Sequence, residues 1–383
     1  MNSRERFRRT MRFQKVDHLP FCEYLGFWEE TVNKWYKEGL PTWVNITWSG
    51  PSEYTGTGCP GSKSLSGVSM LTDYLGLEKK EKFPIDFGPF PRFPRKVLEE
   101  TERSYTEIDE SGVKRLSMKV ASTIPGFLDY PIKTREDFEK IKKRFDPKDI
   151  RRYPKAWSEE LVDFYKEATV PVGFTFPGFF GQGRTWMGLK NFLMTFFRDP
   201  KLIHEMFDFW TDFLIDTMKP VIEAGIIDFA GYWEDMSYKN GPHISPSHFR
   251  EFMLPYYHRV SDFLNKNGVE TITVDTDGDA SLLIPLFLEG GVNCLYPLEV
   301  QAGMDPVKLR KEYGRKLLLI GGLDKKALAD GEQAIRTELD RKLPYMVKQG
   351  GYIPSVDHLV PSDVPYANYL FYLEELKKHL GME

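Results

Sequence analysis

The sequence predicts an α/β protein whose parallel strands close into an eight-stranded (β/α)8 TIM barrel. Short apolar segments rich in β-branched and aromatic residues alternate with helix-like segments along the second half of the chain, which is typical of a parallel sheet. The chain has 383 residues. A barrel needs about 250 residues, so more than roughly 100 remain for insertions. We expect residues 1–383 to form a single domain, with most insertions before residue 165.

The expected strands are apolar segments of suitable length and composition. One lies near the N-terminus, at 19–25, and six follow at 170–176, 226–232, 270–275, 291–296, 316–321 and 351–355. An eighth strand within the region 60–120 would close the barrel. In the same region, residues 103–119 predict a hairpin around the turn Glu110-Ser111-Gly112. We interpret this hairpin as an insertion outside the barrel.

Helix-like segments precede the later strands, at 200–224, 246–267, 281–289, 305–313 and 333–348. Asp199 and Ser245 each place a capping side chain before a proline at the first helical position. A last helix over about 365–380 would present one apolar face. That face comprises Tyr366, Tyr369, Leu370, Leu373, Leu376 and Leu380.

The composition excludes several classes of function. The formal net charge is -4 and acidic residues match basic ones along the chain, so we expect no nucleic-acid and no membrane partner. No apolar run approaches the roughly 18 residues of a membrane span. Cys22, Cys59 and Cys294 are too few for a disulfide framework and lack the spacing of a structural zinc site. The N-terminus has no apolar signal segment, so we expect a cytoplasmic protein.

The candidate site residues follow the strands, because parallel barrels carry their active sites at the carboxyl ends. Asp275 and Asp277 follow one strand, and Glu234, Glu299 and His358 follow three others. Asp275 and Asp277 would share a face, since residues two apart on an extended strand point the same way. Two close carboxylates repel, so either one is protonated or a cation lies between them. An ordinary polar turn and a structural histidine are the simpler alternatives.

Other residues after the strands suit substrate binding. Arg184 would bind an anionic substrate group or pair with a carboxylate at the mouth of the barrel. Glu299 would touch the substrate or orient a loop. We expect four aromatic side chains to enclose an apolar substrate at the mouth: Phe179, Phe180, Trp186 and Trp233.

Several stretches resemble the uroporphyrinogen decarboxylase (URO-D) superfamily, which also contains zinc-dependent, corrinoid-linked methyltransferases. The most specific are ISPSHFREFMLPYYHRV and the C-terminal GGYIPSVDHLVPSDVPYANYLFYLEEL. Three more are MNSRERFRRTMRFQKVDHLPF, VPVGFTFPGFFGQGRTWMG and GGVNCLYPLEVQAGMDPVKLRKEYGRKLLLIGGLD. The resemblance covers nearly the whole chain and is weakest at 50–165. It implies the barrel fold and an enzyme.

The sequence departs from both branches of this superfamily. True decarboxylases carry an arginine pair after the first strand, whereas EYLGFWEETVNKWYKEG contains no arginine. The methyltransferases carry His-x-Cys after the fifth strand and a cysteine after the eighth. Asp275-x-Asp277 and His358 stand there in this chain, and His358 also matches the C-terminal histidine of the decarboxylases. The resemblance therefore implies a metal set of Asp275, Asp277 and His358, which suits Zn²⁺, Mn²⁺ or Fe²⁺.

Two activities follow from the resemblance. The first is a methyltransferase that demethylates a small methylated or methoxylated compound and transfers the methyl group to a corrinoid protein. Asp275, Asp277 and His358 would then bind the metal or protonate the leaving group, with Glu234 completing the shell. The second is a cofactor-free decarboxylase of a porphyrinogen or another activated carboxylate, anchored by Arg184. A non-catalytic binding protein fits the carboxylate-rich mouth least. The sequence leaves a homodimer open.

Overall fold

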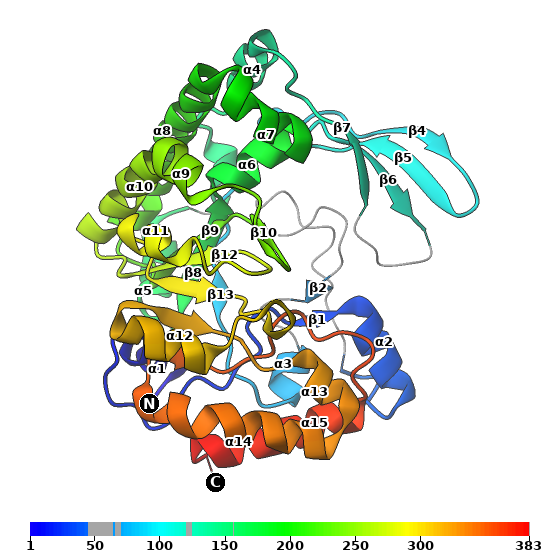
Figure 1. Cartoon of the computed structure of the whole chain (residues 1–383), viewed down its shortest axis with the longest axis vertical. Coiled ribbons are helices and arrows are strands. Elements are labelled where there is room, and N and C mark those ends of the chain that lie inside the picture. Colours follow the sequence, from blue (N-terminus) through cyan, green and yellow to red (C-terminus); the bar gives the residue numbers. More distant parts are fainter. Residues whose placement is uncertain (45–63, 66–69, 120–124, 156, 383) are drawn as a thin grey trace.

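The computed structural model describes residues 1–44, 64–65, 70–119, 125–155 and 157–382 (Figure 1). Its centre is a curled parallel sheet with the strand order β15-β14-β13-β12-β9-β8-β3. These strands are β3 (Glu81–Lys82), β8 (Val172–Pro177), β9 (Phe229–Trp233), β12 (Thr271–Asp275), β13 (Cys294–Tyr296), β14 (Leu318–Ile320) and β15 (Tyr352–Ile353). The six strands predicted after residue 165 are therefore confirmed, and β3 lies within the region predicted to hold one more.

The predicted strand at 19–25 is wrong. This segment lies between β15 and β3, but side chains hold it rather than a ladder of backbone bonds. Pro20 has no N–H, and the backbone N–H of Phe21 donates to the Glu78 carboxylate at 3.0 Å. The backbone N–H of Tyr24 donates to Ser355 Oγ at 3.0 Å. Among the described residues, no continuous ladder joins β15 to β3, so the sheet is curled without a hydrogen-bonded closure.

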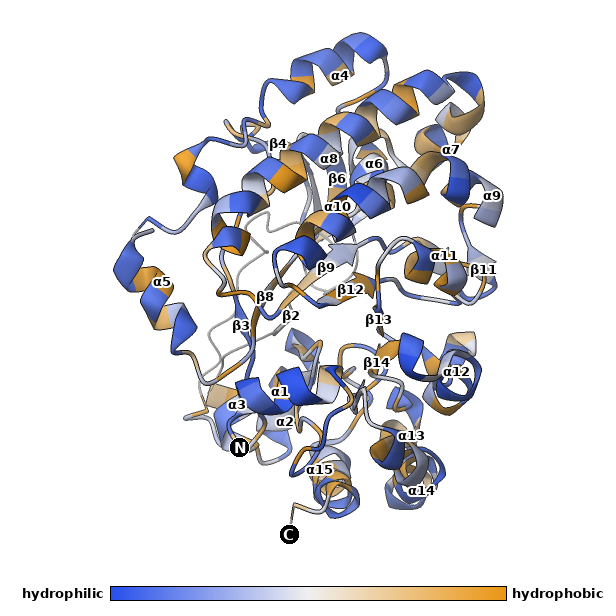
Figure 2. Ribbon diagram, turned by 90° about the vertical axis from the view of Figure 1, so that its left-hand side faces the viewer, coloured by the Kyte–Doolittle hydropathy of each residue, from blue (hydrophilic) through white to orange (hydrophobic). Residues whose placement is uncertain are grey.

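Helices surround the curled sheet, and the central strands are the mainly apolar, orange segments of Figure 2. Asp199 accepts a hydrogen bond from Leu202 N, and Ser245 accepts one from His248 N, which confirms both predicted helix starts. The helices are α1 (Ser3–Met11), α2 (Glu29–Lys37), α3 (Met70–Tyr74), α4 (Arg135–Lys142), α5 (Glu159–Lys166), α6 (Phe179–Met187), α7 (Leu189–Arg198), α8 (Pro200–Glu223), α9 (Pro246–His248), α10 (Leu254–Lys266), α11 (Ile284–Glu289), α12 (Pro306–Tyr313), α13 (Lys325–Asp330), α14 (Glu332–Gln349) and α15 (Tyr366–Leu380).

Short irregular turns complete the helical part: the 3-10 segments Ile150–Arg152, Val300–Ala302 and Gly314–Lys316, and a π-helical segment, Phe249–Met253, that joins α9 to α10. The last helix buries most of its predicted face, but Leu370 is exposed and Tyr372 takes its place in the core. None of the described helices is long and apolar enough to cross a membrane.

The strands carry apolar side chains on both faces and so build two cores. The outer core lies between the sheet and the helices, with Phe174, Tyr232 and Val274 among its buried residues. The inner core fills the inside of the curled sheet, and α1 covers its end with Phe7 and Met11. The inner core also contains Tyr24, Phe229, Cys294, Tyr296, Leu318, Ile320 and Ile353.

A separate antiparallel sheet projects from one side of the molecule (Figure 1). Its strands run in the order β4-β5-β6-β7. They are β4 (Lys96–Glu100), β5 (Ser104–Ile108), β6 (Lys114–Met118) and β7 (Gly126–Asp129). The pairing of β5 with β6 confirms the predicted hairpin and its place outside the central sheet. Two smaller antiparallel pairs are β1 (Phe27–Trp28) with β2 (Ser64–Leu65), and β10 (Ser237–Tyr238) with β11 (Gly241–Pro242).

Candidate active site at the carboxyl ends of the strands

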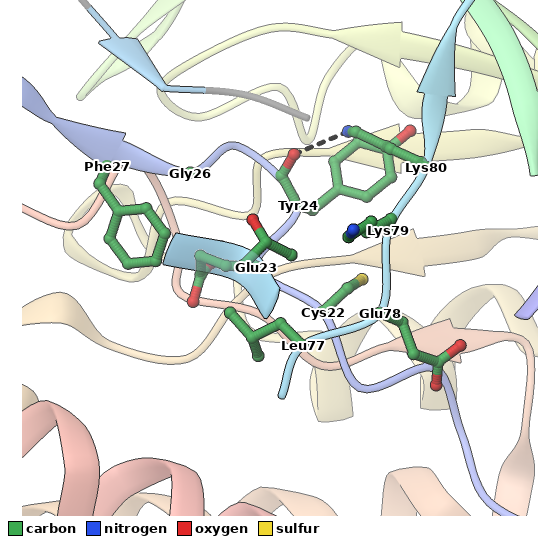
Figure 3. Close-up of a pocket in the computed structure, with 10 residues that line it drawn as sticks. Cys22, Glu23, Tyr24, Gly26, Phe27, Leu77, Glu78, Lys79 and Lys80 are labelled. Atoms are coloured by element: carbon green, nitrogen blue, oxygen red, sulfur yellow. Dashed lines mark hydrogen bonds between the residues drawn. The ribbon is translucent and has the colours of Figure 1, made fainter. Parts of the chain in front are cut away.

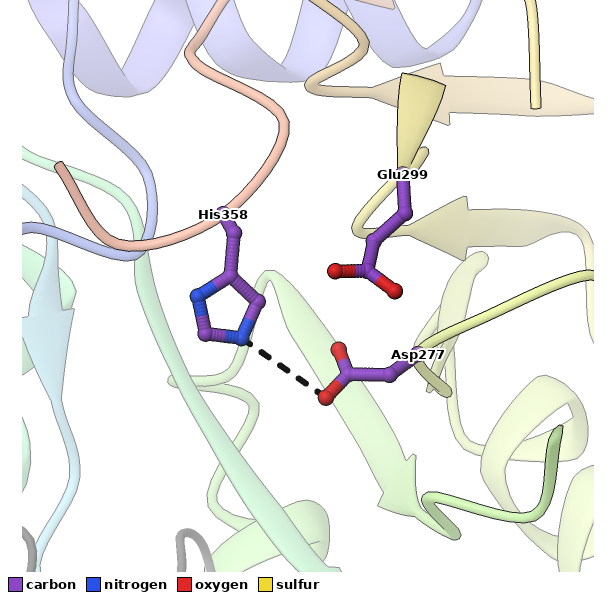
Figure 4. A group of neighbouring side chains, drawn as sticks. All are labelled: Asp277, Glu299 and His358. Carbon is purple, nitrogen blue, oxygen red and sulfur yellow. Dashed lines mark ion pairs between the residues drawn. The ribbon is translucent and has the colours of Figure 1, made fainter. Parts of the chain in front are cut away.

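Asp277, Glu299 and His358 converge beyond the carboxyl ends of β12, β13 and β15 (Figure 4). Each offers one potential ligand atom, and these atoms all lie within 4.8 Å of one another. The Nε2 atom of His358 lies 3.6 Å from Oδ2 of Asp277. The structure thus brings Glu299 next to two of the residues predicted as metal ligands. Asp275, the third predicted ligand, is not part of this cluster of three.

Neighbouring groups hold Glu299 and His358 in place. The backbone N–H of Gly278 donates to Oε2 of Glu299 at 2.8 Å, and the Lys325 ammonium donates to Oε1 at 3.4 Å. The indole ring of Trp28 stacks against the imidazole of His358, with 6.4 Å between ring centroids. Both carboxylate oxygens of Glu299 are therefore oriented before any ligand arrives.

The turn that follows Asp277 requires glycine. Gly278 has a φ of +75°, and a Cβ at this position would lie 2.6 Å from backbone atoms of Tyr238 in β10. The β10–β11 hairpin therefore packs directly on the turn, and Asp279 N donates to Tyr238 O at 3.0 Å. This close approach positions both Asp277 and the N–H that binds Glu299.

The pKa values of the two aspartates in the Asp275-x-Asp277 pair are shifted in opposite directions. Burial, together with the nearby charges of Asp277 and Asp235, raises the pKa of Asp275 well above its ordinary value. Burial works against ionisation of Asp277 as well, but the interaction with His358 and the charges of Lys325 and Arg184 outweigh it and lower the pKa of Asp277. The protonated form is therefore favoured at Asp275 and the ionised form at Asp277.

Each of the two aspartates also interacts with one further side chain, Asp275 with Tyr296 and Asp277 with His358. Tyr296 hydrogen-bonds to the Asp275 side chain. Burial opposes protonation of His358, but its hydrogen bond and ion pair with Asp277 raise the pKa of the imidazole. Asp277 and His358 therefore each favour the charged form of the other.

Arg184 pairs with a carboxylate, which is one of the two roles expected for it. Its guanidinium donates to Oδ2 of Asp235 at 2.7 Å and to the Asp235 carbonyl oxygen at 3.1 Å. The guanidinium also lies over the Trp233 ring, 5.1 Å from its centroid. Asp235 has a φ of +44°, a left-handed conformation that is uncommon outside glycine. Sequence reasoning missed Asp235 as a functional residue, although it directly follows Glu234 at the end of β9.

Glu234 does not join the cluster of possible metal ligands. Its fully buried carboxylate turns to the first turn of α6, where it accepts the backbone N–H groups of Phe179 at 3.0 Å, Phe180 at 2.7 Å and Gly181 at 2.9 Å. The hydroxyl of Tyr257 also donates to it. A carboxylate at a helix N-terminus satisfies amide donors that have no partner within the helix. Glu234 therefore ties β9 to α6.

Three of the four aromatic side chains expected at the mouth lie in the outer core. Phe179 and Phe180 are 0% exposed and Trp186 is 2% exposed. Phe179 packs against Phe207 of α8, and Trp186 packs against Trp210 of the same helix. The reason is that α6 starts directly after β8 and turns its apolar face toward the neighbouring helices. Trp233 is the member of the four that contacts a charged site residue, Arg184.

A half-buried lysine, Lys80, lies at the seam between 19–25 and β3 (Figure 3). The Lys80 ammonium donates to the Tyr24 carbonyl oxygen at 2.7 Å and lies 3.2 Å from the centroid of the Tyr24 ring. Burial lowers the pKa of Lys80 to about 8. The adjoining cavity, also lined by Cys22 and Glu78, measures about 20 Å³, enough for about one water molecule. We interpret Lys80 as a residue that holds this seam together.

Trp28 and Lys325 were also missed by sequence reasoning. Trp28 lies in β1, outside the central sheet, and Lys325 lies in the first turn of α13. The sequence prediction considered only residues directly after each expected strand, and neither Trp28 nor Lys325 lies there. Cys59 lies outside the described residues, and Cys22 and Cys294 are both free thiols.

The sequence of this chain matches a known protein family and two curated relatives. Residues 114–379 match the family described as uroporphyrinogen decarboxylase (URO-D). Two curated relatives, the uroporphyrinogen decarboxylases of Actinobacillus pleuropneumoniae serotypes 5b and 7, are each 23% identical over 190 residues. That match covers 48% of this chain and 50% of each relative, so the chain spans about half the length of the curated relatives it matches.

A solved structure supports the fold over the whole chain. A methyltransferase from Methanosarcina mazei superposes with a TM-score of 0.58 at 14% sequence identity, covering 100% of this chain and 99% of the other. At this identity the likeness concerns the fold. Taken with the match over residues 114–379, it leads to one conclusion: the chain belongs to the uroporphyrinogen decarboxylase (URO-D) family.

Proposed function

We propose that this URO-D family chain is a metal-dependent methyltransferase that demethylates a small methylated or methoxylated compound and passes the methyl group to a corrinoid protein. The observation that carries the proposal is the convergence of Asp277, Glu299 and His358, whose potential ligand atoms lie within 4.8 Å of one another. The fold shared with a methyltransferase from Methanosarcina mazei supports it.

The donor set fits a divalent cation. Two carboxylates and one imidazole suit Zn²⁺, Mn²⁺ or Fe²⁺ about equally. When bound, such an ion would act as a Lewis acid that polarises the heteroatom carrying the methyl group. Gly278 N–H and the Lys325 ammonium hold the Glu299 carboxylate, as carboxylate ligands in metal sites are commonly held by neighbouring donors.

Asp275 would serve the same reaction as a proton donor. Its neutral carboxyl group lies on the strand that leads to Asp277, so a substrate held at the cluster would lie beside a protonated acid. Transfer of that proton to the departing oxygen, nitrogen or sulfur assists loss of the methyl group. The Arg184–Asp235 pair lies on the β9 side of the same mouth and would orient the substrate.

Metal analysis tests this proposal. We expect purified wild-type protein to bind about one equivalent of a divalent metal, and Asp277→Ala, Glu299→Ala and His358→Ala each to lose it, since three ligands hold the ion. The matched control is Asp275→Asn, which leaves the cluster intact and should keep the metal. The proposal is wrong if all three alanine variants retain the metal. It is also wrong if only Asp275→Asn loses it.

A decarboxylase is the second candidate. The observation that favours it is the paired protonation of Asp277 and Asp275, because an ionised Asp277 can stabilise a developing cation while neutral Asp275 and His358 handle protons. The Arg184 guanidinium is already bound to Asp235, which weakens it as a substrate carboxylate anchor. Release of CO₂ from a porphyrinogen by metal-free protein would favour this candidate over the methyltransferase.

A further inference from the structure

We propose that Lys80 and Lys82 form an anion-binding subsite inside the curled sheet, and that the substrate therefore carries a carboxylate or a similar oxyanion. The inference deepens the proposed function, on which it rests, because it names the chemical class of the methylated compound. Lys82 lies in β3 and Lys80 two residues before it, so neither lysine belongs to the cluster of possible metal ligands.

The strand register places both lysines on the inner face of the sheet. Lys82 pairs with Gly173 of β8, and Gly173 pairs with Phe229 of β9, which belongs to the inner core. Paired residues of neighbouring strands point to the same side of a sheet. Lys80 is two residues earlier and shares this face, in agreement with its contact to Tyr24 of the inner core. Both side chains therefore start on the inside of the curled sheet.

Solvent reaches the inner face on this side of the sheet. Lys82 is exposed, and Lys80, Thr175 and Asp275 are half-buried. Thr175 lies on β8, the strand next to β3, two residues after the partner of Lys82. Its neighbour Phe174, which points outward, is only 1% exposed. The accessible side chains are thus the inward-pointing ones, so a small ligand can approach the lysines from inside the sheet.

Three contacts connect Lys80 to the candidate active site. The Lys80 ammonium lies 3.2 Å from the centroid of the Tyr24 ring (Figure 3). The Tyr24 ring meets the Tyr296 ring edge-on, with 5.0 Å between the ring centroids. Tyr296 in turn hydrogen-bonds to the side chain of Asp275, which precedes Asp277 by two residues. The two lysines and the Asp277 cluster therefore border the same interior.

The charge of Lys80 is available to a ligand. Among the described residues, Lys80 makes no ion pair, and its hydrogen bond goes to the neutral Tyr24 carbonyl oxygen. An ammonium group has three donors, so Lys80 has donors beyond the one that holds the seam. Burial is the main cause of its lowered pKa, and the nearby charge of Lys82 lowers the pKa further. An oxyanion bound to both ammonium groups would relieve this repulsion and accept charge-assisted hydrogen bonds.

The position of the two lysines indicates which part of the substrate they bind. Two strands, β8 and β9, separate β3 from β12, which leads to Asp277. The oxyanion and the heteroatom that carries the methyl group therefore lie at opposite ends of the substrate. A methoxylated aromatic acid with its two substituents in para positions has this arrangement, whereas a simple neutral ether lacks the anionic end.

Isothermal titration calorimetry with two matched ligands tests the proposal. The ligands para-methoxybenzoate and para-methoxybenzyl alcohol share the methoxyl group and have similar sizes, but only the first is an anion. We expect wild-type protein to bind the acid at least about tenfold more tightly, since hydrogen bonds to a charged group add to the binding free energy. Lys80→Met and Lys82→Met should each weaken binding of the acid roughly tenfold and leave binding of the alcohol unchanged.

The neighbouring lysine supplies a matched control. The Lys79 ammonium pairs with Asp73, so Lys79→Met should leave the binding of both ligands unchanged. Lys82 is exposed, so Lys82→Met should fold even if Lys80→Met loosens the seam, and thermal unfolding of each variant checks this. Wild-type protein that fails to bind the acid, or binds both ligands equally, would overturn the subsite. Binding of the acid that survives both lysine variants would overturn it as well.

Metal analysis of the same variants separates this inference from the proposed function. Because neither lysine belongs to the cluster, Lys80→Met and Lys82→Met should both retain the metal. If wild-type protein holds no metal but prefers the acid through the two lysines, the methyltransferase proposal fails and the subsite stands. If wild-type protein holds the metal without preferring the acid, the subsite alone fails.

Discussion

Asp275 and Asp277 are the same amino acid, two positions apart, and yet their pKa values shift in opposite directions. Asp275 is desolvated at the end of β12 and lies near the carboxylates of Asp277 and Asp235, so its neutral form is favoured. Asp277 lies beyond the strand end, beside His358, so its charged form is favoured. Their spacing predicted either that one of the pair is protonated or that a cation lies between them. Which one depends on neighbours from β13 and β15, which are far away in the sequence.

Glu234 carries a prediction about pH. Burial raises its pKa to about 7 from an ordinary 4.5, although the Tyr257 hydroxyl and three backbone N–H groups oppose the shift. The folded chain therefore holds this proton more tightly than the unfolded chain. We expect the contribution of Glu234 to the free energy of unfolding to be fully present below pH 4.5 and to fall by about 3 kcal/mol as pH rises through 7.

Chemical denaturation across this pH range checks the prediction. Glu234→Gln cannot titrate, so the stability difference between wild type and this variant should shrink as pH rises. Glu223→Gln, an exposed position at the end of α8, is the control and should follow wild type at every pH. If the difference in free energy of unfolding between wild type and Glu234→Gln stays constant or grows with pH, the raised pKa of Glu234 is contradicted.

At the scale of elements, the turn after β12 sets the geometry of the cluster. Gly278 and Gly225 have similar backbone angles, with φ of +75° and +69°. A Cβ on Gly225 meets nothing within 4 Å, whereas one on Gly278 meets the Tyr238 backbone at 2.6 Å. We expect Gly225→Ala to cost about 1 kcal/mol of stability from the left-handed conformation alone. Gly278→Ala should cost at least about 3 kcal/mol, because the backbone must also move.

Urea denaturation and metal titration measure both effects. Gly278→Ala should also weaken metal binding, since Gly278 N–H holds Glu299, whereas Gly225→Ala should leave metal binding unchanged. Equal losses of stability in the two variants would show that the hairpin does not press on the turn.

The elements of the second half of the chain could be predicted because their signals are local. The predicted segment 270–275 corresponds to β12, and Ser245-Pro246 marks the start of α9. The segment 19–25 has the composition of a strand, but two of its backbone N–H groups donate to the side chains of Glu78 and Ser355, and a single backbone bond, from Glu78 N to Phe21 O, joins it to the segment before β3. No local pattern reveals such partners.

The sequence predicted where the candidate site lies, but it did not predict which of the strand-end residues form the cluster. Strand ends identified Asp277, Glu299 and His358 as neighbours, because parallel strands present their carboxyl ends together. Glu234 stands at an equivalent position but turns toward the amide groups at the start of α6. The direction of a side chain at a strand end depends on which donors the next helix offers, and that is a tertiary property.

At the scale of the whole molecule, α1 fastens the amino-terminal end of the curled sheet. The Arg4 guanidinium binds the buried Asp228 carboxylate at 2.9 Å and donates to the carbonyl oxygens of Tyr165, Lys166 and Ile226. One side chain therefore joins α1, the segment before β8 and the segment before β9. This network depends on the planar fork of donors that arginine has and lysine lacks.

Replacing Arg4 should destabilise the whole fold. We expect Arg4→Lys to lower the free energy of unfolding by about 3 kcal/mol, because several buried carbonyl groups would lose their donor and Asp228 would keep only Arg8 and the Val172 N–H as partners. Arg9→Lys is the matched control on the same helix. Arg9 is exposed and pairs only with Glu5 among the described residues, so its replacement should cost less than about 0.5 kcal/mol. Equal stabilities of the two variants would refute this role of Arg4.

The amino-terminal segment also finds its partners very late in synthesis. Arg4 binds Asp228, Tyr24 binds Ser355 and the Trp35 indole donates to the Val364 carbonyl oxygen. On a ribosome that adds about 5 to 20 residues per second, the first forty residues would wait roughly 20 to 60 s for these partners. During that interval Phe7, Met11 and Trp35 have no core to enter. Docking of residues 1–40 therefore has to wait until Ser355 and Val364 have been made.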